Sequence, residues 1–293
     1  MASILVDNWT LESAAYSMTE AINNNTPPNY EYIKLVEAIV LWDHIYYVDN
    51  QFANIWKRVL HPLGYDRFLL PADSLCDTEE EYKTFCDHAR YVSSTYEGVV
   101  ACGAIEYRAL SEQLCIAYLP SKRRAEFLAN NHRITPLINR DNIYNSYNDQ
   151  IDEFYIEINN MLGQKLLTFD FPVLFDFVFD HAPTSDIIDK ALEIKNMKDI
   201  CSYRSYMDDL EQEITNGNYI GLRNHLDEIR RVVESIINKR NTRMNGELQL
   251  SITPSIIPSF NANIPLTPKV INRKHHLDFF RRLTRYALHE RRR

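Results

Sequence analysis

The sixteen residues 166–181 constrain the fold more than any other stretch of this 293-residue chain. They combine five Leu and Val residues with five phenylalanines, namely Phe169, Phe171, Phe175, Phe177 and Phe179. Burying apolar surface stabilises a fold by about 25 cal/mol per Å². We therefore expect this stretch to lie in a large core, and Pro172 to open a helix if the stretch is helical, because proline is favoured in the first helical turn.

The rest of the chain has the signature of helices. Only seven glycines occur, which argues against the many tight turns of an all-β sandwich or barrel. Apolar residues instead recur every three or four positions, as in residues 199–215. We predict a mainly α protein, an irregular multi-helix bundle with at most a minor β-hairpin.

The predicted helices have the following ranges: residues 10–22, 30–49, 52–60, 79–92, 99–117, 122–130, 149–161, 186–196, 199–215, 219–239 and 272–291. Within the second of these, the β-branched and aromatic run 45–48 is also compatible with a short strand. Four prolines between Pro254 and Pro268 separate the last helix from the others. The chain then divides into a helical core domain (1–240), a Pro-rich linker or small hairpin (241–271) and a basic C-terminal helix (272–293).

Charge is distributed unevenly along the sequence. The net charge is −8, but residues 268–293 contain nine Lys and Arg against two acidic residues. This segment carries +7, and the preceding residues carry −15. We expect the basic helix to dock on the acidic body of its own chain or of another copy, or to bind a protein partner or nucleic acid, with salt-sensitive affinity in the last case.

The strong catalytic and cofactor motifs are missing. No GxGxxG or GxxxxGK phosphate loop, HExxH or CxxC metal motif, or GxSxG elbow occurs. The spacing of Cys76, Cys86 and His88 fits no standard zinc finger. We therefore expect no metal and no cofactor. The chain also lacks a signal peptide and any apolar run of membrane-spanning length, so we expect a cytoplasmic protein with reduced cysteines and no membrane contact.

One weak catalytic pattern lies in the last helix. Arg282 and His289 are seven residues apart, which places them on one helical face. This spacing resembles the short Arg–His motif of HEPN-type ribonucleases, in which arginine stabilises phosphoryl charge and histidine acts as acid or base. The alternative is that both belong to a basic, solvated helix.

Three segments together resemble a pattern found in uncharacterised bacterial helical proteins. They are Tyr118-Leu119-Pro120 followed by Arg124, Phe171-Pro172 with its apolar run, and residues 191–195 followed by Tyr203-Arg204. The resemblance covers about the middle third of the chain. It implies a bacterial source and no activity.

The leading hypothesis is a non-enzymatic interaction or regulatory component of a bacterial cytoplasmic assembly. It would bind a protein partner, or nucleic acid, through the basic residues of the C-terminal helix: Arg273, Lys274, Arg281, Arg282, Arg285, Arg291, Arg292 and Arg293. The alternative hypothesis is a HEPN-like ribonuclease effector of a toxin or phage-defence system, with Arg282 and His289 as its catalytic residues.

Overall fold

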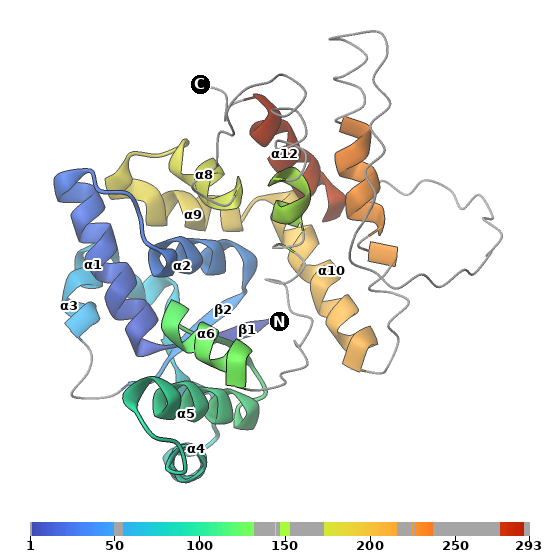
Figure 1. Ribbon diagram of the computed structural model, residues 1–293. Coiled ribbons are helices and arrows are strands. Elements are labelled where there is room, and N and C mark those ends of the chain that lie inside the picture. The colour runs from blue at the N-terminus through green and yellow to red at the C-terminus, as the bar shows by residue number, and fades with distance from the viewer. Residues whose placement is uncertain are drawn as a thin grey trace, which may run out of the picture.

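Helices form most of the described chain, and four short strands lie between the helices of its first half (Figure 1). The computed structural model describes residues 2–49, 55–131, 144, 147–152, 173–215, 224–225, 227–236 and 276–289. The strands are β1 (Ser3–Val6), β2 (His44–Tyr47), β3 (Leu69–Pro71) and β4 (Ala117–Leu119). The helices of the first half are α1 (Asn8–Asn24), α2 (Tyr30–Leu41), α3 (Ile55–Leu60), α4 (Glu79–Ser93), α5 (Val99–Gln113) and α6 (Lys122–Asn131).

The four strands form one parallel sheet in the order β3-β2-β1-β4. Ile4 of β1 lies opposite Ile45 of β2 on one side and Ala117 of β4 on the other. The chain adds strands in one direction from β1 to β3 and then returns to the opposite side of β1. The junction between β1 and β4 is therefore the topological switch point of the sheet.

Both faces of this sheet are covered by helices. Ile4 and Val6 point into the main core, which includes buried residues of α1 and α2. Leu5, between them in sequence, belongs to a second core that contains Ala89 of α4 and Leu110 of α5. Because successive side chains of a strand point to opposite faces, the strands separate two helical layers, as Figure 1 shows.

The second half of the described chain extends the main core. Its helices are α8 (Val173–Phe179), α9 (Ile187–Lys195), α10 (Lys198–Thr215) and α12 (His276–His289), with further helical residues at 224–225 and 227–236. Phe175 of α8 meets Tyr32 of α2 edge to face, and Phe177 meets Tyr286 of α12 in the same manner. The described part of the phenylalanine-rich stretch thus joins α2, which covers the sheet, to the C-terminal helix.

The prediction of a mainly α protein is confirmed. The sequence patterns do not predict the parallel sheet. The predicted helix 30–49 ends at Leu41, and the short strand considered within it is β2. The predicted helix 99–117 is wrong at its end, because the helix stops at Gln113 and Ala117 already pairs with β1. Residues 241–271 lie outside the described residues, and the division into three domains stays a prediction.

None of the helices in the described ranges combines the length and the apolar character that a membrane crossing requires.

Candidate functional site

The apolar face of α12 is part of the main core. Phe279, Phe280, Leu283 and Ala287 are completely buried. Tyr203 of α10 contacts the rings of both phenylalanines, with centroid distances of 5.0 and 5.2 Å. The position of α12 is therefore fixed by packing against the core.

The opposite side of α12 carries three arginines. Arg281 pairs with Asp278 of the same helix at 2.7 Å, and Arg282 pairs with Asp199 of α10 at 3.0 Å. Arg285 is exposed, and no ion pair joins it to another described residue. At 100° per residue, positions 281, 282 and 285 fall within about 100° of the helix circumference. Together they form the arginine face of α12.

The remaining predicted binding residues cannot be located on this face. Arg273, Lys274, Arg291, Arg292 and Arg293 lie outside the described residues.

The two predicted catalytic residues are only partly described. His289 is the last residue of α12, but its side chain is not among those described. The Arg282 guanidinium contacts Met197 as well as Asp199. Arg282 thus has an acidic partner in the fold, and its pairing with His289 in a catalytic site stays a prediction.

A cluster of metal-type ligands lies at the N-terminal end of α12. His225, Glu228 and His276 place one donor atom each within 4.8 Å of the others. The Glu228 carboxylate is 3.8 Å from Nε2 of His276, and His225 is completely buried. The ring of Tyr206 on α10 stacks on His276 at 3.9 Å and lies 4.6 Å from His225. In the sequence, this cluster appears only as a His-x-x-Glu pair and a distant histidine. None of the metal-binding motifs considered above contains this combination.

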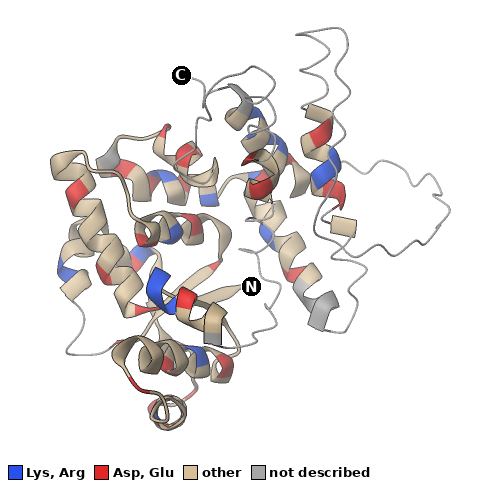
Figure 2. Cartoon of the chain, in the orientation of Figure 1, with Lys and Arg blue, Asp and Glu red and all other residues tan. Residues whose placement is uncertain are grey.

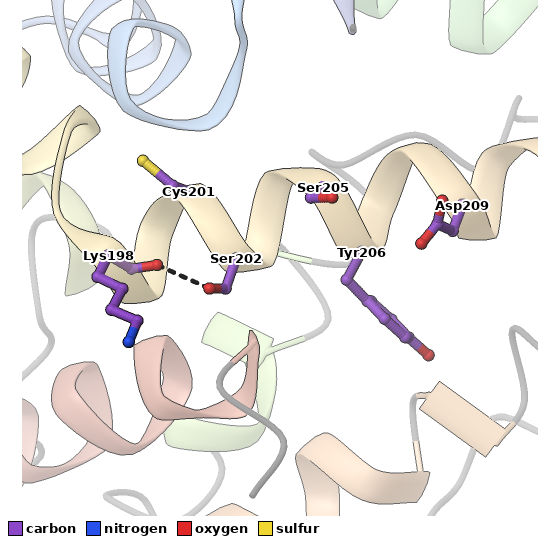
Figure 3. Close-up of a pocket in the computed structure, with 6 residues that line it drawn as sticks. All are labelled: Lys198, Cys201, Ser202, Ser205, Tyr206 and Asp209. Atoms are coloured by element: carbon purple, nitrogen blue, oxygen red, sulfur yellow. Dashed lines mark hydrogen bonds between the residues drawn. The ribbon is translucent and has the colours of Figure 1, made fainter. Parts of the chain in front are cut away.

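A shallow pocket of about 470 Å³ runs along α10 beside this cluster. Its lining consists of Lys198, Cys201, Ser202, Ser205, Tyr206 and Asp209 (Figure 3). Figure 3 shows Tyr206 projecting from α10 toward the neighbouring helical segments. Tyr206 therefore belongs both to the pocket wall and to the ring stack over the two histidines.

The switch point of the sheet, where open α/β sheets commonly bind ligands, is filled by a buried ion pair. Asp7 follows β1 and Arg124 lies in α6, and their side chains are 2.6 Å apart. Asp7 is 0% exposed and Arg124 is 5% exposed. The Tyr118 hydroxyl donates to Asp7 at 3.0 Å, and the guanidinium lies 4.4 Å from the centre of the Trp9 ring. These contacts give Arg124 a structural role.

A second ion-pair network joins α9 and α10 to Asp43. This residue directly precedes β2, at the end of the sheet opposite the switch point. Arg204 donates to Asp43 at 2.8 Å and to the carbonyls of Val40 and Lys195. The Lys195 ammonium donates to the carbonyl of Asp43 at 2.7 Å. Burial and the neighbouring Arg204 lower the pKa of Lys195 to about 8. Lys195, Arg204 and Arg124 therefore all hold elements of the fold together.

In comparisons with known proteins, no family model, no curated protein and no solved structure matches this chain.

Proposed function

We propose that this protein is a non-enzymatic interaction component that binds an acidic protein surface through the arginine face of α12. The supporting observation is that a helix sealed into the core on one side presents Arg281, Arg282 and Arg285 on the other. A rigid helix holds cationic groups in fixed positions, so less conformational entropy is lost when a partner binds.

The arginines keep binding capacity despite their internal ion pairs. A guanidinium carries five N–H donors, and a single carboxylate occupies at most two of them. The side chains of Arg281 and Arg282 are 35% and 39% exposed, and Arg285 is exposed as well. A partner carboxylate can therefore pair with this face without breaking the contacts to Asp278 and Asp199.

An acidic protein fits this surface better than nucleic acid does. Figure 2 shows acidic and basic residues interspersed over α12 and the helices beside it. Asp278 and Asp199 lie directly beside the arginines. A phosphate backbone requires a continuous basic track, and these carboxylates would repel it. The chain itself is acidic outside its C-terminal segment, since the residues before 268 carry a net charge of −15. A second copy is therefore the partner to test first.

The test is sedimentation velocity of the full chain at low and high salt. We expect concentration-dependent association at low salt that weakens as salt screens the charges. The charge-reversal variant Arg285→Glu should abolish this association. Deleting residues 272–293 would be a poor test, because it also removes buried side chains such as Phe280 and Leu283 from the main core.

The matched control is Arg123→Glu. Arg123 is exposed on α6, which lies well away from α12 in Figure 1, and the substitution changes the net charge by the same amount. If both variants weaken association equally, net charge rather than the arginine face is responsible. If the chain stays monomeric at low salt while a labelled RNA binds and Arg285→Glu prevents it, nucleic acid is the partner and the protein-binding proposal is wrong.

The ribonuclease alternative has a separate test. Replacing His289 with alanine should eliminate RNA cleavage by the purified protein without lowering its stability if Arg282 and His289 form a catalytic pair. Intact RNA with the unmodified protein, in every oligomeric state, would contradict this alternative.

A further inference from the structure

We propose that His225, Glu228 and His276 bind one divalent transition-metal ion, with zinc as the best-fitting metal. This departs from the expectation of no metal drawn from sequence motifs. The proposal rests on the meeting of three ligand-type side chains from two helical segments.

The local sequence explains how the ligands converge. His225 and Glu228 are three residues apart in a helical segment, so both side chains lie on one face, one turn apart. His276 is the first residue of α12 and brings the third donor from a second helix. Three ligands from two packed helices form a site only in the folded protein.

The donor set matches the chemistry of zinc. Two imidazole nitrogens and one carboxylate are a common set of protein ligands for zinc sites that keep a fourth position open. With bonds of about 2.0–2.2 Å, ligand atoms in a tetrahedral site are roughly 3.4 Å apart. The donor atoms here lie within 4.8 Å of one another, and Glu228 is 3.8 Å from His276. Small side-chain rotations that close the widest separation by about 1.4 Å would complete the geometry.

The surroundings hold the imidazoles in position. Tyr206 stacks parallel to His276, with an angle of 2° between the rings, and also contacts His225. Phe280 meets the ring of His225 from the α12 side, at a centroid distance of 6.5 Å. Imidazoles fixed between aromatic rings lose little further freedom when they bind a metal, which favours binding.

An ion has access to this cluster from solvent. His276 and Glu228 are 12% and 24% exposed, whereas His225 is fully buried. The pocket along α10 shares Tyr206 with the cluster. We therefore expect the fourth ligand, a water or a small anion, to occupy the side of the ion that faces this pocket.

Metal titration of the full chain tests the proposal. After treatment with a chelator, the protein should bind one equivalent of Zn²⁺ by isothermal titration calorimetry. Co²⁺ should bind in its place with the visible absorption of a four-coordinate site and without a sulfur-to-cobalt charge-transfer band. Glu228→Gln and His276→Gln should each weaken Zn²⁺ binding by at least ~10-fold, because even changes to residues that only hydrogen-bond to metal ligands cost that much.

Asp209→Asn is the matched control, because Asp209 lines the pocket but supplies no donor to the cluster. It should leave Zn²⁺ affinity unchanged. Circular dichroism and thermal melting of the metal-free variants establish that each one is folded. If Zn²⁺ in several-fold molar excess does not bind, or if it binds equally well to the Glu228 and His276 variants, these residues form no metal site and the proposal is wrong.

Discussion

The buried ion pair at the switch point allows a quantitative prediction. Asp7→Asn preserves the size of the side chain and removes its charge. Asparagine caps a helix about as well as aspartate, so the cap of α1, in which the Asp7 side chain accepts from the amide of Trp9 at 2.6 Å, should persist. The Arg124 guanidinium, only 5% exposed, would then lack its buried counter-charge.

The expected cost is large because both charges lie away from water. Removing one partner of a buried ion pair typically destabilises a protein by about 3–5 kcal/mol. Each 1.4 kcal/mol changes the folding equilibrium constant about tenfold. The unfolding equilibrium constant of the Asp7→Asn variant should therefore be roughly 140- to 3,700-fold larger than that of the unmodified chain.

Urea unfolding followed by tryptophan fluorescence measures this effect, with the urea dependence of the free energy expected to stay constant. A double-mutant cycle with Arg124→Met isolates the pair. The double variant should lose at least ~2 kcal/mol less than the sum of the two single variants, because it leaves no buried charge unpaired. Additive losses, or a loss below about 1 kcal/mol for Asp7→Asn, would show that the pair behaves like an exposed one.

Three further predictions concern the packing of the same fold. A Cβ at Gly103 of α5 would collide with the guanidinium of Arg124. Gly103→Ala should therefore destabilise the protein in urea. In the Arg124→Met background the same change should be neutral or stabilising, because only the better helix propensity of alanine remains. The pKa of Lys195 is about 8 in the folded protein and 10.5 ordinarily. Between these pH values, Lys195 binds fewer protons in the folded state than in the unfolded state. The unfolding free energy should therefore rise with pH in this window. Urea titrations at several pH values should show a smaller rise for Lys195→Met, and an equal rise would contradict the assignment. Phe280→Ala should cost about 3–5 kcal/mol, because it leaves a cavity in the main core; a loss below about 1 kcal/mol would mean that α12 is not part of that core.

Local sequence patterns indicate most of the described helices and one apolar stretch of the main core. Helical periodicity is a local property, so apolar residues spaced three and four positions apart indicate which face of a helix is buried. The spacing of Phe280, Leu283 and Ala287 alone places them on one face of the last helix, and all three are buried. The apolar run at 173–179 was likewise expected in the core, where α8 lies.

The sheet and the partners of the charged residues depend on contacts between distant parts of the chain, which local sequence patterns do not reveal. The strands are three or four residues long, too short for a period-2 pattern to stand out, and Ile4 pairs with Ala117 across more than a hundred intervening residues. A charge in the sequence likewise does not reveal its counter-charge. From the sequence, Arg282 is part of a basic surface. In the fold, the packing of α12 on α10 places it beside Asp199. His225 and His276 similarly share no local pattern, because ion pairs and metal-ligand clusters depend on distances in space that the chain fixes only when it folds.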